Sequence, residues 1–274
     1  MNKFIIVGTI AGTMALSSFV ASAAVVSVGG ISWDDDTTGP GLGGITAQAN
    51  FQQWFIDPSL TATGMSGGVD VLNAVVSAGA VAGVFGSELV GVGEFYSFAD
   101  GRSPSGFCDT GACELTFSFG GLVVDGVNTF NSSSAWFNIY IDETPDFPVN
   151  GPNETVLSST SYTKYEEAQN GTLWASLAFD SFILDGTLIG GETEFTMSVV
   201  TGKALAAVET ALNYNSPIYS DIAFTAGATF VSNDLHTLDG NGQLLNIRVP
   251  EPTSLAILGL GLLGFAGAAR RKKA

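Results

Sequence analysis

The chain has 274 residues and a formal net charge of −17, from 26 Asp and Glu against 9 Lys and Arg. Such an acidic surface repels phosphate backbones, which argues against nucleic acid as a partner. Because 46% of the residues are hydrophobic and 11% are aromatic, the chain can bury a large core, and this composition excludes a disordered stalk.

The N-terminus has the three parts of a secretory signal peptide. Lys3 is basic, residues 4–16 are mostly apolar, and Ala21, Ser22 and Ala23 form a small-x-small cleavage site. We therefore predict export by the Sec route, with residues 1–23 as the signal peptide and cleavage before Ala24. An uncleaved anchor fits less well, because the apolar stretch is short.

The middle of the chain, residues 24–249, carries most of the acidic charge. It holds 25 acidic residues and four basic ones, a net charge of about −21. Such a region attracts cations, including Ca²⁺, even without a dedicated site. Its 226 residues suit one large β domain or two small ones, and we favour one domain over the whole range.

Eight segments of this region have the alternation or the β-rich composition of strands. They are residues 47–55, 89–98, 114–124, 135–141, 173–184, 194–200, 222–231 and 244–249. Only residues 203–212 are typical of a helix, because they are rich in Ala and lack Gly and Pro. The predicted fold is all-β, an antiparallel β-sandwich or a jelly-roll-like domain.

The two cysteines, Cys108 and Cys113, are close in sequence. In an oxidising compartment we expect them to form a disulfide that clamps a tight turn before the strand at residue 114. A zinc site is disfavoured, since only one histidine, His236, could complete it. We predict no metal ligands and no cofactor.

The sequence contains a motif that resembles a catalytic site, but the segment around it lacks the local structure that such a site requires. Residues 64–68 fit G-x-S-x-G around Ser66, and His236 follows later, but the segment is rich in Thr, Gly and Ser and does not form a strand-to-helix elbow. With a single histidine, most acid-base and nucleophilic mechanisms lose their usual participant. The sequence therefore predicts a protein that is not an enzyme.

Carboxylates are the remaining candidates for catalytic groups. A glycosidase would need two of them across a sugar, but in so acidic a chain solvated surface charge explains each pair. The pairs considered are Asp142 or Glu143 with Asp146, Glu166 with Glu167, and Glu192 with Glu194. Residues 34–39 begin like a Ca²⁺ loop, yet Ile45 stands where the closing acid should be, which excludes an EF-hand and leaves a weaker Ca²⁺ site open.

Four tryptophans could serve as core or as a sugar-stacking platform on one face of the fold. Most aromatic residues of β folds are core, so a stacking role is the less favoured of the two. The tryptophans are Trp33, Trp54, Trp136 and Trp174.

The C-terminus contains a single apolar segment with a basic end. Residues 253–269 are 17 uncharged residues, which as a helix would span about 25 Å, the short end of what crosses a bilayer. The four basic residues that follow should stay in the cytoplasm, so the chain before Pro250 lies outside. They are Arg270, Arg271, Lys272 and Lys273.

Together with Pro250, Glu251 and Pro252, this segment resembles the PEP-CTERM sorting signal of exported bacterial proteins. The resemblance covers residues 250–274 and implies that a membrane transpeptidase, exosortase, processes the tail. It also implies a Gram-negative host that makes extracellular polysaccharide, a transient anchor in the inner membrane through the transmembrane helix, and release to the cell surface or matrix. A plain C-terminal membrane anchor is the alternative.

From these features we expect an exported protein of the cell surface or extracellular matrix. Its role would be structural or adhesive, in biofilm or floc, with extracellular polysaccharide as a partner. The alternatives are a secreted lectin-like module that binds carbohydrate, with or without Ca²⁺, and a secreted hydrolase.

Overall fold

The computed structural model describes residues 25–34, 45–56, 75–76, 87–98, 104–147, 166–188, 190–213, 220–229 and 240–246. The predicted signal peptide with its cleavage site, and the predicted sorting signal with its transmembrane helix, lie outside these ranges. Within them, no helix has the length and apolar character needed to span a membrane.

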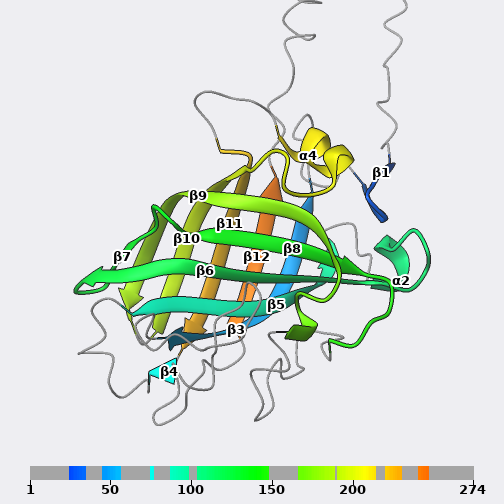
Figure 1. The fold of residues 1–274 in the computed structure, drawn as a ribbon. Coiled ribbons are helices and arrows are strands. Elements are labelled where there is room, and N and C mark those ends of the chain that lie inside the picture. The colour runs from blue at the N-terminus through cyan, green and yellow to red at the C-terminus, as the bar shows by residue number, and fades with distance from the viewer. Residues whose placement is uncertain are drawn as a thin grey trace, which may run out of the picture.

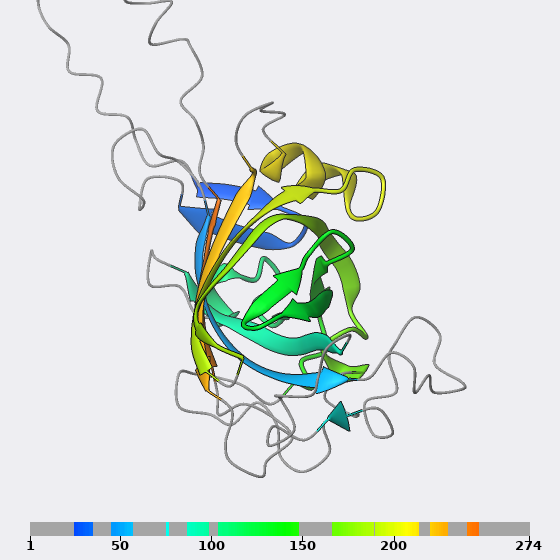
Figure 2. The same cartoon turned by 90° about the vertical axis from the view of Figure 1, so that its left-hand side faces the viewer.

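Within the described residues, eight antiparallel strands form a closed barrel. Each strand pairs with the next along the chain, and the last pairs back with the first. The strands are β3 (Thr46–Ile56), β5 (Glu88–Phe98), β6 (Glu114–Gly126), β8 (Trp136–Asp142), β9 (Thr172–Thr187), β10 (Gly190–Val199), β11 (Ile222–Thr229) and β12 (Gly240–Asn246). In Figure 1, β5, β6, β8 and β9 cross the front of the molecule, while β10, β11, β12 and β3 run behind them at a steep angle. Figure 2 shows the strands curving around a common interior.

The predicted sandwich or jelly roll is wrong, although each of the eight predicted strand segments overlaps one strand of the barrel. A sandwich has two separate sheets with four edges, whereas here β12 pairs with β3 and the sheet has no break between the two walls. Alternation fixes which residues face inward, but it does not decide whether the outermost strands meet. The helix predicted at residues 203–212 is present as α4 (Ala206–Leu212).

Phenylalanine rings fill the interior of the barrel. Phe117 stacks on Phe137 with ring centroids 4.8 Å apart, and it lies 4.9 Å from Phe95. Phe224 packs against Phe137 at 5.6 Å and against Phe195 at 5.0 Å. All five are buried. An eight-stranded barrel is just wide enough for side chains to fill, so these rings leave little free space at its centre.

The rings fit because glycines lie beneath them on neighbouring strands. In the β5–β6 register, Gly93 is opposite Phe117 and Gly91 is opposite Phe119. A Cβ on Gly93 would lie 2.4 Å from the Phe117 Cζ and 2.3 Å from the backbone oxygen of Asn50. A Cβ on Gly91 would lie 2.4 Å from the Phe119 Cζ. These positions therefore require glycine because no side-chain carbon fits there.

Short elements cover one end of the barrel. A hairpin of β1 (Val25–Val28) and β2 (Ile31–Asp34) lies beside α4 near that end (Figures 1 and 2). The indole N–H of Trp174, on β9, donates to the backbone oxygen of Gly29 at 3.1 Å. The remaining short elements are α2 (Pro104–Phe107), β4 (Val75–Val76) and β7 (Thr129–Asn131).

The structure contains the Cys108–Cys113 disulfide that the sequence predicts. Asp109, inside the turn that this bond closes, accepts hydrogen bonds from Ser27 at 2.6 Å and from Ser32. Its backbone N–H donates to the Gly30 oxygen at 2.9 Å. The disulfide turn thus attaches the N-terminal hairpin to the barrel at the start of β6.

Glu209 organises the turn before α4. Its carboxylate accepts hydrogen bonds from the backbone N–H groups of Gly202, Lys203 and Ala204 at 2.8 to 2.9 Å. The bonds from Ala204 and Gly202 lower the pKa of the Glu209 carboxyl below its ordinary value, because they stabilise the charged form.

We predict that Gly93→Ala destabilises the protein by about 1–3 kcal/mol, the usual cost of overpacking a core. The matched control is Gly227→Ala on β11, where an added Cβ would have nothing within 4 Å; its effect should stay within about 0.5 kcal/mol. Urea unfolding of both variants measures the difference. Equal stabilities for the two variants would contradict the proposed fit between ring and glycine.

We also predict that Glu209→Gln lowers the melting temperature at neutral pH. The lowered pKa means that the wild-type carboxylate stabilises the fold above the ordinary value of 4.5 and loses this effect as the pH falls through its folded value. The difference in melting temperature between wild type and variant should therefore shrink as the pH is lowered from 7 towards 2. If the difference in melting temperature stayed constant over this pH range, the charge of Glu209 would not contribute to stability.

Candidate functional site

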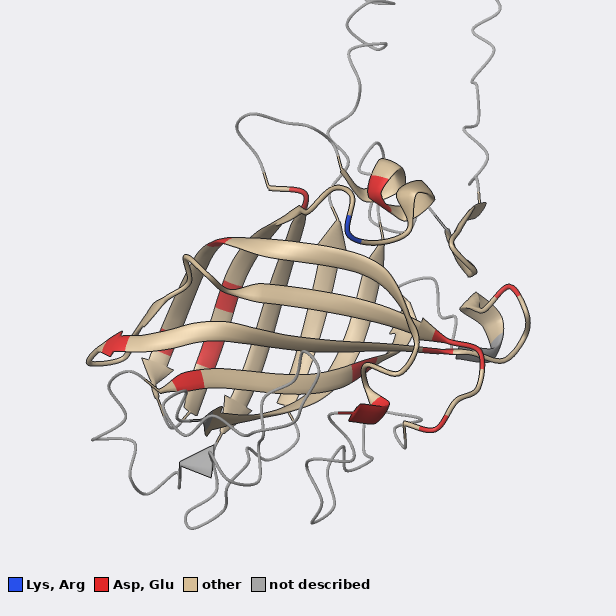
Figure 3. Ribbon diagram, viewed as in Figure 1, with Lys and Arg blue, Asp and Glu red and all other residues tan. Residues whose placement is uncertain are grey.

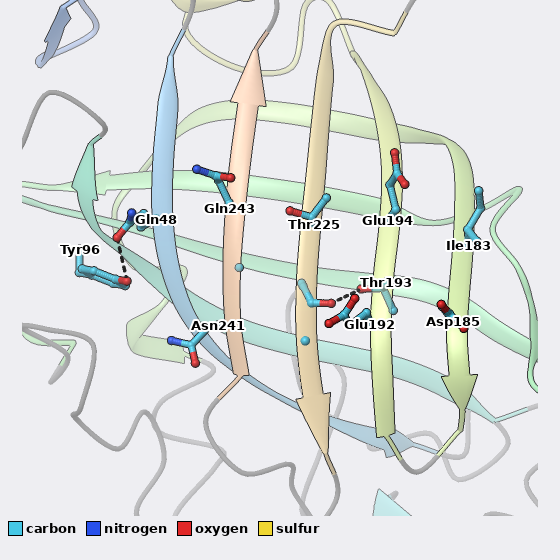
Figure 4. A pocket seen from close by; sticks show the side chains of 13 residues that line it. Gln48, Tyr96, Ile183, Asp185, Glu192, Thr193, Glu194, Thr225, Asn241 and Gln243 are labelled. Carbon is cyan, nitrogen blue, oxygen red and sulfur yellow. Dashed lines mark hydrogen bonds between the residues drawn. The ribbon is translucent and has the colours of Figure 1, made fainter. Parts of the chain in front are cut away.

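An open groove with a volume of about 750 Å³ lies on the outer face of β9, β10, β11, β12 and β3 (Figure 4). We call it the outer groove. It is lined by Gln48, Tyr96, Ile183, Asp185, Glu192, Thr193, Glu194, Thr225, Ala226, Gly227, Asn241, Gly242 and Gln243.

The strand register arranges the exposed side chains of the outer groove in two parallel rows. The first row runs from Gln48 through Gln243, Thr225 and Glu194 to Ile183. The second row runs from Asn241 through Gly227 and Glu192 to Asp185, and so crosses four strands. Because adjacent strands are spaced about 4.8 Å apart, a row across five strands is about 19 Å long.

The composition of the core dictates which residues reach this face. Along β12, Leu244 is buried while Asn241 and Gln243 are exposed, and along β11 Phe224 is buried while Thr225 is exposed. Since side chains alternate across a strand, packing the apolar set inside places amides and hydroxyls outside. Between Asn241 and Glu192 the second row has Gly227, which leaves that position without a side chain.

Tyr96 forms one side of the outer groove. It is the extra residue of a β-bulge, because the β3–β5 register passes from Gln48 opposite Ser97 to Ala49 opposite Phe95. The Tyr96 hydroxyl donates to the Gln48 Oε1 at 3.1 Å, as Figure 4 shows. Burial raises the pKa of Tyr96 above its ordinary value, so the hydroxyl stays protonated at neutral pH.

The charge of the outer groove is entirely negative. Asp185, Glu192 and Glu194 are exposed carboxylates, and the lining includes no basic residue. Figure 3 shows acidic positions over several barrel strands and almost no basic ones; in the described part of the chain, Lys203 is the one Lys or Arg. A polymer of phosphates, sulfates or carboxylates would be repelled here, whereas an uncharged polyhydroxyl ligand would not.

The side chains that line the outer groove offer many hydrogen-bonding groups. Asn and Gln side chains each present both donors and acceptors, and Thr225 adds a hydroxyl. Of the carboxylate pairs considered from the sequence, Glu192 and Glu194 are in the outer groove, and both are exposed. Ser66 and His236 lie outside the described residues.

None of the four tryptophans considered as a sugar-stacking platform lines the outer groove. Trp33, Trp54 and Trp174 are at most 3% exposed, so they are core, and Trp136 does not line the outer groove. The amides at Gln48, Asn241 and Gln243 were not singled out, because their alignment depends on register. The sequence did offer one signal for these amides: they are the polar residues of segments in which polar and apolar residues alternate. In the described ranges, three acidic side chains converge within 4.8 Å only at Glu114, Asp142 and Asp146, none of which lines the outer groove.

Comparison with known proteins identifies the tail. Residues 248–272 match the model of the PEP-CTERM protein-sorting motif, which confirms the resemblance seen at Pro250, Glu251 and Pro252. No curated protein and no solved structure matches the chain. The motif indicates an exported protein that exosortase sorts.

Proposed function

We propose that this protein, once exported, acts without catalysis as a component of the cell surface or extracellular matrix, and that it associates with uncharged extracellular polysaccharide through the outer groove. The observation that carries the proposal is the two adjacent rows of exposed, mostly polar side chains, the first across five strands and the second across four. The sorting motif at residues 248–272 supplies the route to the outside.

The shape of the outer groove supports a polymeric ligand. It is open rather than an enclosed cavity, and the first row extends for about 19 Å, room for several sugar residues in line. Amides and hydroxyls on rigid strands can donate to and accept from sugar hydroxyls along that length. Individual hydrogen bonds contribute only about 0.5–1.5 kcal/mol net, so affinity would come from their repetition.

The acidic surface supports the choice of an uncharged polysaccharide. An anionic polymer would bring like charges beside Asp185, Glu192 and Glu194 without any basic side chain in the lining to balance them. A structural or adhesive role follows from this mode of binding, since a protein held at the cell surface that also binds a matrix polymer links the two.

The proposal predicts that Thr225→Arg weakens binding of the uncharged polysaccharide purified from the producing culture by at least about tenfold, or about 1.4 kcal/mol. Thr225 is central in the first row, and a long side chain there blocks the outer groove. Affinity electrophoresis in gels containing that polysaccharide measures the change.

The matched control is Thr229→Arg, an exposed threonine at the end of the same strand that does not line the outer groove. It adds the same charge and should bind as the wild type does. Binding that is unaffected by Thr225→Arg, or lost equally in both variants, would remove the outer groove as the binding site.

Processing at both ends gives a second prediction. Intact-mass spectrometry of the protein from the culture surface or supernatant should give the mass of a chain that starts at Ala24 and ends near Pro250. The reason is that both apolar ends act as addresses which are removed during sorting. A mass that retains Arg270 to Lys273 would instead support a permanent membrane anchor.

A further inference from the structure

Three carboxylates, one from the start of β6 and two from the end of β8 and the loop after it, meet beside the disulfide turn. Glu114 is the first residue of β6, directly after Cys113, and it pairs in register with Asp142, the last residue of β8. Asp146 follows four residues later, where the chain folds back over the start of β6. One carboxylate oxygen from each residue lies within 4.8 Å of the others. We call these residues the carboxylate cluster.

One oxygen of the carboxylate cluster is buried without a partner. Glu114 is 1% exposed; its Oε2 accepts a hydrogen bond from the backbone N–H of Phe147 at 2.9 Å. Its Oε1 has no hydrogen-bond partner in the described part of the chain. A buried polar atom in this state is costly, and a bound water or ion is one of the ways in which native proteins satisfy it.

Without a positive charge nearby, the three carboxylates of the cluster repel one another. The pKa of Glu114 is raised to about 7: burial is the main cause and the charges of Asp146 and Asp142 add to it, while hydrogen bonds from the backbone of Phe147 and Asp146 act in the opposite direction. Like charges directly opposite each other on paired strands destabilise a sheet. The one basic side chain of the described residues, Lys203, belongs to the turn before α4 and not to the carboxylate cluster. A bound cation would offset both the cost of burying the Glu114 charge and the repulsion among the three carboxylates.

We propose that Glu114, Asp142 and Asp146 bind a Ca²⁺ ion. The ligand atoms are all carboxylate oxygens, which hard cations prefer, and nitrogen and sulfur ligands of the kind that zinc takes are missing from the cluster. Two oxygens on opposite sides of one Ca²⁺ are separated by up to about 5 Å, twice the metal–oxygen distance. The 4.8 Å limit within the carboxylate cluster agrees with this spacing.

The surroundings hold two of the carboxylates in place and leave access for solvent. Asn170 donates to the Asp146 Oδ2 at 2.9 Å, and the backbone N–H of Thr144 donates to the Asp142 Oδ1 at 2.7 Å. Asp142 is partly exposed and Asp146 is exposed. Water molecules can therefore complete the six to eight oxygens that Ca²⁺ takes. The ion would fasten the loop after β8 to the start of β6.

This inference is independent of the polysaccharide proposal, because the carboxylate cluster shares no residue with the outer groove. Isothermal titration of the exported protein with CaCl2, after treatment with EDTA, tests it. We expect one saturable site per chain with a Kd on the order of 10⁻⁴ to 10⁻³ M, the range of extracellular calcium modules. We also expect a melting temperature that rises with CaCl2 concentration.

Glu114→Gln is the test variant and Glu192→Gln is its control, since both remove one glutamate charge and only the first belongs to the carboxylate cluster. We expect Glu114→Gln to weaken binding at least tenfold and Glu192→Gln to leave it unchanged. In EDTA, Glu114→Gln should melt no lower than wild type, because it removes like-charge repulsion, and this shows that it folds. The proposal fails if wild type shows no saturable binding, or if the two variants bind Ca²⁺ equally.

Discussion

Phenylalanine rings that lie against glycines on the neighbouring strand hold this barrel together. Gly91 and Gly93 lie under Phe119 and Phe117, and Gly240 on β12 lies under Phe51 on β3, with its Cβ position 2.5 Å from the Phe51 Cζ. The last pair bridges the strands that close the barrel. Each buried ring contributes roughly 1.5–3 kcal/mol from the burial of apolar area, and a larger residue at any of these glycines would push the two strands apart.

The outer groove is a consequence of the same constraint. When Phe224 and Leu244 turn inward, Thr225 and Gln243 must turn outward, since alternate side chains occupy opposite faces. Barrel closure then places Gln48 of β3 beside Gln243 of β12, so that residues far apart in sequence form one polar row. The groove thus needs the seam between β12 and β3, and a fold with a free edge at this position would divide it.

The sequence predicted where the strands and the helix lie but not how the strands pair with one another. Alternation located the strands, as at residues 114–124 for Glu114–Gly126, and Ala-rich composition located α4. The sandwich prediction was wrong because closure depends on the pairing of Gly240–Asn246 with Thr46–Ile56, which local patterns do not encode. The groove and the carboxylate cluster were missed for a related reason. Asp142 and Asp146 were recognised as a pair, but Glu114 joins them only through the register of β6 with β8.

Closure of the barrel is the central claim, because the core and the polar rows both depend on it. Hydrogen exchange of the backbone amides in residues 46–51 and 240–245 tests it directly, since these segments form the closing pair. In a closed barrel both segments are hydrogen-bonded on two sides, and we predict protection equal to that of β6 and β8. Rapid exchange in both segments, as expected at the free edges of an open sheet, would contradict this account.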